Sequence, residues 1–176
     1  DKERYEHKYE YCDLLITGSG PSGLASAYAA AQNGAKVILA EDKSRFGGSL
    51  LTSEVTIGNQ SGKEWAEKII SELKSMPNVV VKNRSQVFGY YDHNMLVMSE
   101  RISDHLPKTE KYSPKQRLWY IRAKEVIISS GSIERPLVFG NNDTPGVMLS
   151  SAAKEYLKIY GVLVGKNPLI FTNNDS

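Results

Sequence analysis

The segment that most constrains the fold of this 176-residue chain is Gly18-Ser19-Gly20-Pro21-Ser22-Gly23. It follows a short apolar run, Asp13–Thr17, that predicts a strand, and it opens an alanine-rich run that predicts a helix over Pro21–Asn33. Glycines in a G-x-G-x-x-G pattern permit a tight turn, a close backbone approach to a pyrophosphate, and close packing of helix on strand. The N–H groups at a helix N-terminus favour the same anion. The pattern therefore predicts a dinucleotide-binding loop, and the alternative is a glycine-rich turn without a ligand.

A second apolar strand, Lys36–Glu41, follows the predicted helix, which we expect to end at Asn33-Gly34. The order strand, helix, strand predicts a right-handed βαβ unit. Glu41 ends the second strand, where a carboxylate accepts hydrogen bonds from a ribose in dinucleotide-binding folds. Asp42 is the alternative candidate for this role, and a solvated acid at a strand end is the structural alternative for both residues.

The other elements are predicted from apolar periodicity and from turn residues. In chain order they are a helix over Lys63–Met76, a strand over Val79–Val81, a hairpin of Gln86–Tyr91 and Leu96–Met98, a loop over 102–116, strands over Leu118–Arg122 and Glu125–Ser129, a helix over Ser150–Tyr160 closed by Gly161, and a strand over Leu169–Thr172. Together they predict an α/β, Rossmann-like domain with a mainly parallel sheet and a small antiparallel insertion around residues 86–122. We expect a polar lead-in over 1–12, the dinucleotide-binding domain over 13–160, and the truncated start of a second nucleotide-binding-type subdomain over 161–176.

Composition argues against several classes of function. The net charge is +2 and the basic residues are scattered, which argues against nucleic-acid binding. The sequence contains no run of eighteen apolar residues, so it predicts no membrane span. Its charged start lacks the apolar core of a signal peptide. The single cysteine, Cys12, excludes an internal disulfide and is expected to be a small buried residue. We therefore expect a cytoplasmic protein, and we predict no metal site because the histidines lack ligand spacing.

Two further glycine-containing segments are candidates for the same site. Gly47-Gly48 can bring a second set of backbone amides to the phosphates, although a flexible turn is the alternative. The segment VIISSGS, residues 126–132, is a strand that ends in small residues, which would let a cofactor lie against the backbone. By contrast, Asp92 and His93 are expected to form the turn of a hairpin rather than a catalytic pair.

Several segments are more distinctive than the glycine pattern. They are DLLITGSGPSGLASA, AKVILAED, FGGSLL, VFGYYDHN, RLWYIRAKEVIISSGSIERPLVFGNNDTPGVML and YLKIYGV. Together they resemble the α subunit of heterotetrameric sarcosine oxidase over nearly the whole chain after residue 12, and the stretch 117–149 is the most specific. The chain departs from that family at Ser19 and Ser22, where alanine is frequent, and at Ser129, where the family often has Ala-Thr-Gly in place of Ser-Ser-Gly.

The resemblance implies a glutathione-reductase-type domain that holds NAD+ in an oxidoreductase complex. In that family the β subunit carries the FAD that oxidises sarcosine, an FMN lies between α and β, and γ and δ subunits complete the heterotetramer. The complex converts sarcosine, oxygen and tetrahydrofolate to glycine, hydrogen peroxide and methylenetetrahydrofolate. The folate domain of the family's α chain has no counterpart in this chain, so no catalytic residue is assigned and the chain alone is not expected to be catalytic.

The resemblance also implies the roles of individual residues. It implies that Glu41 holds the adenosine ribose and that the phosphate loop is formed by Gly18, Ser19, Gly20, Pro21, Ser22 and Gly23. Gly48 and Ser49 would approach the dinucleotide from the other side, and Val87 would lie near the adenine. Ser130 and Gly131 would line the site after their strand. Two alternatives stay open, because NAD+ and FAD present the same ADP half to these residues. One is an FAD-binding subunit of a related amine, opine or proline dehydrogenase complex, and the other is a non-catalytic module that contacts other subunits.

Overall fold

The structure of the chain is a computed structural model that describes residues 3–110 and 112–173. Its contacts separate two compact units, Asp1–Leu50 with Glu54–Gly131 and Leu51–Ser53 with Ser132–Ser176. Every strand of the described residues lies in the first unit, and the second contains one described helix. The predicted dinucleotide-binding residues all fall within the first unit.

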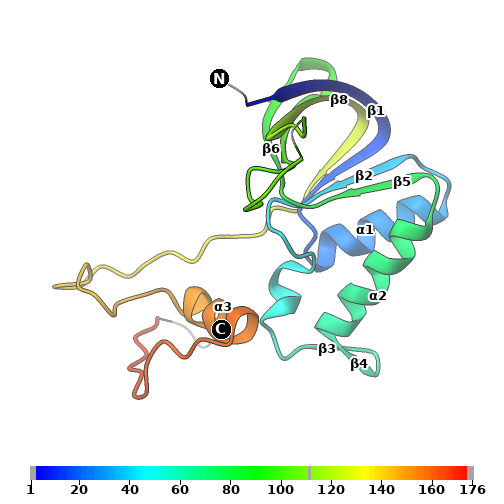
Figure 1. Cartoon of the computed structure of the whole chain (residues 1–176). Coiled ribbons are helices and arrows are strands. Elements are labelled where there is room, and N and C mark those ends of the chain that lie inside the picture. The colour runs from blue at the N-terminus through cyan, green and yellow to red at the C-terminus, as the bar shows by residue number, and fades with distance from the viewer. Residues whose placement is uncertain (1–2, 111, 174–176) are drawn as a thin grey trace. The chain divides into compact units, whose positions relative to one another are not determined.

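The first unit is built on a sheet that has six strands among the described residues (Figure 1). The strands are β1 (Tyr5–Thr17), β2 (Val37–Ala40), β5 (Val79–Lys82), β6 (Ser85–Tyr91), β7 (Met95–Arg101) and β8 (Gln116–Ile128), in the spatial order β5-β2-β1-β8-β7-β6. The strands β5, β2, β1 and β8 are parallel to one another, whereas β7 is antiparallel to both β8 and β6. The mainly parallel sheet with a small antiparallel part is therefore confirmed.

Two helices cover one face of the parallel strands (Figure 1). α1 (Pro21–Gln32) begins with proline in its first turn, where no N–H is needed, and ends at Asn33 before a left-handed Gly34. α2 (Gly62–Ser75) follows a short hairpin of β3 (Thr56–Ile57) and β4 (Gln60–Ser61). Its first turn is fixed by a capping box, in which Ser61 and Glu64 exchange hydrogen bonds.

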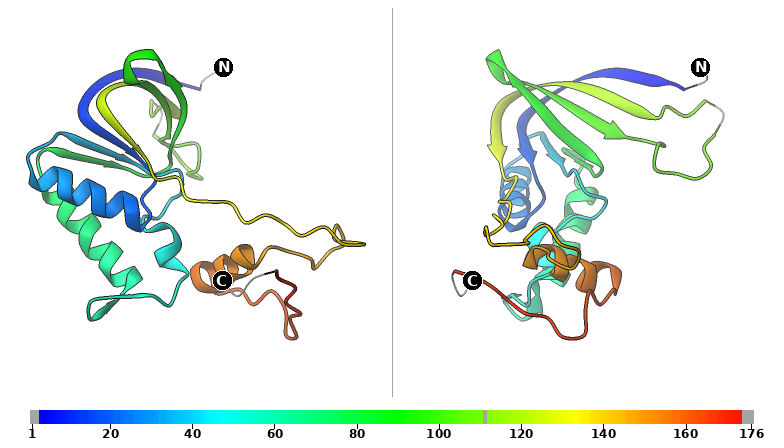
Figure 2. Two further views of the ribbon diagram at one scale, coloured as in Figure 1. Left: turned by 180° about the vertical axis from the view of Figure 1, so that it is seen from behind. Right: turned by 90° about the vertical axis from the view of Figure 1, so that its left-hand side faces the viewer.

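The core consists of two clusters on opposite faces of the parallel strands. The first lies under the helices and joins Ile16 and Leu39 to α1 and α2. The second contains Leu15 and Ile38, whose side chains alternate to the other face, together with side chains of the antiparallel part such as Met98. The sheet therefore curls over itself, as Figure 2 shows, and its layers are helices, parallel strands and antiparallel strands. This arrangement leaves the carboxyl ends of β1, β2 and β8 together.

Two strands are longer than the sequence predicts. β1 begins at Tyr5 rather than Asp13, so the part of the predicted lead-in from Tyr5 to Cys12 pairs with Gln116–Ala123 of β8. β8 is one continuous strand instead of two, because it pairs with β1 on both sides of Lys124, from Gln116 to Ile128. Residues 1 and 2 of the lead-in lie outside the described residues.

The second unit contains α3 (Ser150–Tyr160), which ends at Gly161 with a left-handed φ of 68°, as predicted. The predicted strand Leu169–Thr172 is wrong, because these residues have no partner strand in the described chain and Leu169 is 96% exposed. The predicted boundary at residue 160 also differs from the division at 131/132, since no described residue between 132 and 160 is buried. The domain boundaries stay predictions, and residues 174–176 lie outside the described residues.

Candidate dinucleotide site

The predicted phosphate loop lies at the carboxyl end of β1, between its two neighbouring strands. The Gly18 N–H donates to the carbonyl of Ala40 at the end of β2 at 2.8 Å, and the Ser129 N–H donates to the carbonyl of Thr17 at 2.8 Å. Gly18 has a φ of +97°, and a Cβ atom there would lie 2.3 Å from the Ser129 carbonyl oxygen. Glycine is therefore required at this turn for both conformation and space.

The third glycine of the pattern brings α1 against the strand. A Cβ atom on Gly23 would lie 1.9 Å from the carbonyl oxygen of Gly18, which backbone atoms cannot accommodate. Gly23 is itself buried, as is the next residue, Leu24. This is the close helix–strand packing that the fingerprint predicts for this position.

The second glycine differs from the other two, because it faces open space. Apart from Gly20 itself and its chain neighbours, no atom of the described chain lies within 4 Å of a Cβ atom built on Gly20. Gly20 is the N-cap residue of α1, and it has no side chain that could form a capping hydrogen bond with the first turn. The loop thus leaves open space beside the helix N-terminus, where backbone N–H groups and the helix dipole favour an anion.

Glu41 follows β2 and is held against this loop from several sides. One carboxylate oxygen, Oε2, accepts hydrogen bonds from the Ser19 N–H at 2.9 Å and from the Ser19 hydroxyl. The other oxygen, Oε1, accepts from the Lys43 N–H at 3.0 Å. Both Glu41 and Ser19 are buried. The acid that the sequence predicts for the ribose is therefore fixed at the edge of the phosphate loop.

Burial raises the pKa of Glu41, and a hydrogen bond with Asp42 raises it further. The hydrogen bonds from Ser19 and from the Lys43 backbone act in the opposite direction, because they favour the ionised carboxylate. Asp42 itself is exposed. Of the two candidate acids, Glu41 is the one that the fold holds beside the loop.

The second glycine pair contacts the phosphate loop. The Gly47 N–H donates to the Ser19 carbonyl at 3.1 Å, and a Cβ atom on Gly48 would lie 2.8 Å from the Cα atom of Gly20. Gly48 opens the short 3-10 helix η1 (Gly48–Leu51), which also contains Ser49. The backbone of this segment therefore lies beside the open space at Gly20.

The remaining predicted residues come from the end of β8, from β6 and from the first turn of α1. Ser130 and Gly131 follow β8, and the Cα atom of Ser130 lies 3.3 Å from a Cβ atom built on Gly18. Val87 lies on β6, which reaches the end of β2 through a hydrogen bond from the Ser85 N–H to the Glu41 carbonyl at 2.7 Å. Val87 is half-buried against the second core cluster. Pro21 and Ser22 are exposed in the first turn of α1.

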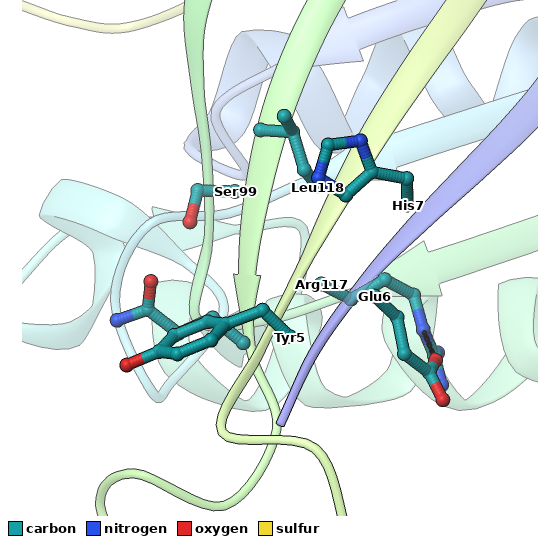
Figure 3. Close-up of a pocket in the computed structure, with 7 residues that line it drawn as sticks. Tyr5, Glu6, His7, Ser99, Arg117 and Leu118 are labelled. Atoms are coloured by element: carbon teal, nitrogen blue, oxygen red, sulfur yellow. Dashed lines mark hydrogen bonds and ion pairs between the residues drawn. The ribbon is translucent and has the colours of Figure 1, made fainter. Parts of the chain in front are cut away.

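A separate pocket of about 290 Å³ lies at the other ends of the same strands (Figure 3). Tyr5, Glu6 and His7 of β1 line it together with Arg117 and Leu118 of β8, and the Arg117 Nε donates to the Glu6 carboxylate at 2.8 Å. None of the predicted dinucleotide residues lines it. It lies at the amino ends of parallel strands, whereas ligands of such sheets bind at the carboxyl ends.

The sequence predictions on metal sites, membrane spans, Cys12 and the Asp92-His93 turn can be compared with the described residues. Residues 3–110 and 112–173 contain no cluster of three or more metal-binding side chains, and none of their helices is long and apolar enough to cross a bilayer. Cys12 is buried, as predicted, and burial raises its pKa to about 12, so the thiol stays protonated. Asp92 and His93 form the turn between β6 and β7, as predicted.

Comparison with known proteins identifies the family of this chain. The model of the family described as FAD dependent oxidoreductase matches residues 13–114, which contain the phosphate loop, Glu41 and the antiparallel hairpin. The chain belongs to this family of FAD dependent oxidoreductases. The match accounts for the Rossmann-like fold and for a dinucleotide site of the FAD type.

Within the FAD dependent oxidoreductase family, the predicted resemblance is confirmed. The chain is 45% identical over all of its 176 residues to the sarcosine oxidase α subunit of Rhizobium meliloti (strain 1021). It is 25% identical over 92% of its length to an opine oxidase subunit of Agrobacterium tumefaciens (strain Ach5), where it covers 33% of that protein. The chain spans 18% of the length of the sarcosine oxidase relative, so it corresponds to a small part of that protein.

A solved structure supports the fold independently of these sequences. The crystal structure of L-proline dehydrogenase from P. horikoshii matches with a TM-score of 0.73 at 23% identity, covering 91% of this chain and 31% of that one. From the sequence, Ser19 is expected only to be a small residue of the phosphate loop. Its hydroxyl contact with Glu41 is a feature that the sequence reasoning missed, and serine in place of the frequent alanine was the available signal.

Proposed function

We propose that the first unit binds the ADP half of a dinucleotide, as the nucleotide-binding part of a sarcosine oxidase α subunit. The observation that carries this proposal is the open space on the side-chain side of Gly20, the N-cap residue of α1. Glu41 stands beside it at the end of the next strand. A pyrophosphate and a ribose need these two features at this spacing.

The described residues fit such a ligand in shape and in chemistry. A Cβ atom on Gly20 would enter the space that a pyrophosphate needs, and it meets no protein atom there. Glu41 accepts three hydrogen bonds from Ser19 and from the Lys43 backbone, and it also forms a hydrogen bond with the exposed side chain of Asp42. In the proposed complex a ribose hydroxyl would replace the contact with Asp42. Gly48, Ser49, Ser130, Gly131 and Val87 would complete the surroundings.

The identity of the dinucleotide has two candidates. NAD+ is the first, because the resemblance to sarcosine oxidase α subunits implies it. FAD is the second, and the description of the family favours it. Either would supply hydride or electron transfer at its far end, whereas the residues of this chain bind and orient the ADP half. The loop and Glu41 act equally on both, because both contain the same adenosine diphosphate.

We propose that this chain binds the dinucleotide in a larger complex, and that the residues that oxidise the substrate lie in other parts of that complex. The relative at 45% identity is named as a subunit of sarcosine oxidase, and the opine oxidase relative is also named as a subunit. We therefore expect β, γ and δ partner subunits, oxidative demethylation of sarcosine in the complex, and a cytoplasmic location. The flavins that react with sarcosine would lie outside this chain.

Calorimetric titration of the purified chain with ADP, NAD+ and FAD tests the proposal. Glu41→Gln should weaken ADP binding about tenfold or more, because a ribose hydroxyl loses a charged acceptor. Glu67→Gln is the matched control, since Glu67 is an exposed acid on α2 outside the site. Wild-type chain that binds none of the three nucleotides would contradict the proposal. Tighter binding of FAD than NAD+, with a bound flavin spectrum, would select the second candidate.

A further inference from the structure

Ser19 links three segments of the candidate site through one buried side chain. Its hydroxyl donates to Glu41 Oε2 and accepts a hydrogen bond from the Gly47 N–H at 3.2 Å. Its backbone N–H donates to the same carboxylate oxygen, and its side chain is fully buried. The donor of this hydroxyl and one of its acceptor positions are therefore used within the protein.

These contacts fix where the Glu41 carboxylate stands. Two hydrogen bonds from one residue hold Oε2 toward the phosphate loop, and the Lys43 N–H holds Oε1. A carboxylate held at both oxygens has little rotational freedom, so the edge of Glu41 that a ribose hydroxyl would contact has a set direction. We propose that Ser19 is the positioning residue for Glu41, so that its hydroxyl prepares the acid for a ribose hydroxyl. The ribose part of this inference rests on the proposed function.

The electrostatic surroundings support this role. Glu41 is buried, and both burial and the hydrogen bond with Asp42 raise its pKa. Ser19 opposes this increase by donating to the ionised form, and the Lys43 backbone N–H assists. An alanine at position 19 would keep the backbone donor and lose the hydroxyl. It would therefore leave Glu41 both less fixed and more easily protonated.

Binding of two nucleotides to Ser19→Ala distinguishes positioning from a general structural role. We expect ADP to bind about tenfold more weakly, which is the effect of one hydrogen bond to a charged group. The variant should bind 2′-deoxy-ADP as the wild type does, because that ligand lacks the hydroxyl that Glu41 accepts. In the Glu41→Gln background the same substitution should change ADP affinity by less than about twofold. Ser71→Ala, at an exposed position on α2, is the matched control.

A second readout needs no ligand. The carboxyl carbon of Glu41, followed by NMR against pH in the unliganded chain, should titrate at a higher pH in Ser19→Ala than in the wild type. An unchanged titration overturns the inference, and so does an equal loss of both nucleotides or an undiminished effect in Glu41→Gln. If the wild type binds neither nucleotide, the proposed function fails, and the carboxyl titration still decides whether Ser19 positions Glu41. Thermal unfolding of each variant verifies that it is folded.

Discussion

Gly20 and Gly23 are three positions apart, yet the structure gives them opposite constraints. A Cβ atom on Gly23 would lie 1.9 Å from the Gly18 carbonyl oxygen, whereas one on Gly20 would meet nothing within 4 Å. Gly20 also has a φ of −67°, which any residue adopts. We therefore expect Gly20→Ala to fold with wild-type stability but to bind ADP about tenfold or more weakly, since its methyl group occupies the pyrophosphate position.

Gly23→Ala is the companion variant, and its loss should be structural. Backbone atoms of Gly18 would have to move, so the Tm of the variant should be several degrees lower than that of the wild type, or the variant should fail to fold. Thermal unfolding and calorimetric titration of both variants separate the two effects. Equal affinity for ADP in Gly20→Ala and wild type would place the pyrophosphate away from this loop and contradict the site.

Ser129 gives a second prediction for a single residue. Its Oγ atom is buried and has no hydrogen-bond partner in the described part of the chain. A buried hydroxyl without a partner costs about 1 kcal/mol or more, so Ser129→Ala should raise the free energy of unfolding by about 1 kcal/mol. Urea unfolding measures this change. A lower stability in the variant would mean that the hydroxyl has a partner in solution.

At the level of elements, the sequence predicts what depends on neighbouring residues. The predicted limits of α1, α2 and α3 agree with the structure to within a residue, because proline in the first turn, apolar periodicity and a glycine after the last turn are local signals. The first half of β1 was missed because its two faces carry tyrosines, charged residues and a histidine, so no apolar alternation marks it. Its strand character depends on β8, which lies more than a hundred residues away.

The same reasoning explains the strand that was predicted wrongly. The stretch Leu169–Thr172 has the composition of a buried strand, but a strand forms only where another strand completes its hydrogen bonds. The phosphate loop, by contrast, was predictable because its glycines, its helix and its acid follow one another within about thirty residues. The contact between Ser19 and Glu41 was not, since it depends on how the two loops meet.

The N-terminus of α3 makes a pH prediction for one helix. The Glu134 carboxylate accepts hydrogen bonds from the Ser151 N–H at 2.8 Å and from the Ser150 hydroxyl at 2.9 Å. Chiefly because of the Ser151 N–H, the pKa of Glu134 is lowered to about 2 from its ordinary value of 4.5. A lowered pKa means that the cap stabilises the helix fully above pH 4.5 and is lost as the pH falls toward 2.

The amide proton of Ser151, followed by NMR from neutral to strongly acidic pH, measures this cap directly. Its resonance should stay constant near pH 4.5 and move only at lower pH. In Glu134→Gln the pH-dependent movement should disappear. A midpoint near 4.5 in the wild type would show that the carboxylate is solvated and does not cap the helix.

At the scale of the molecule, the candidate site depends on the sheet that joins β1 to β8. Residues Tyr5–Lys8 of β1 pair with Gln116–Trp119, and the Glu6 carboxylate accepts a hydrogen bond from Arg117. Removing residues 1–8 takes away about four backbone hydrogen bonds, which should lower the free energy of unfolding by about 2–4 kcal/mol. In a domain of this size that change lowers Tm by about 5–15 °C.

A truncation at the other end is the matched comparison for this prediction. Residues 162–173 contain no strand, no helix and no buried side chain, so ending the chain after Gly161 should leave the unfolding of the first unit unchanged. Scanning calorimetry of the two truncations and the wild type compares them directly. Because the phosphate loop follows the same strand at its far end, the first truncation should also weaken ADP binding as the temperature approaches its lower Tm. An unchanged Tm after removal of residues 1–8 would mean that this half of β1 does not hold the sheet together, and that a polar lead-in is the better description of it.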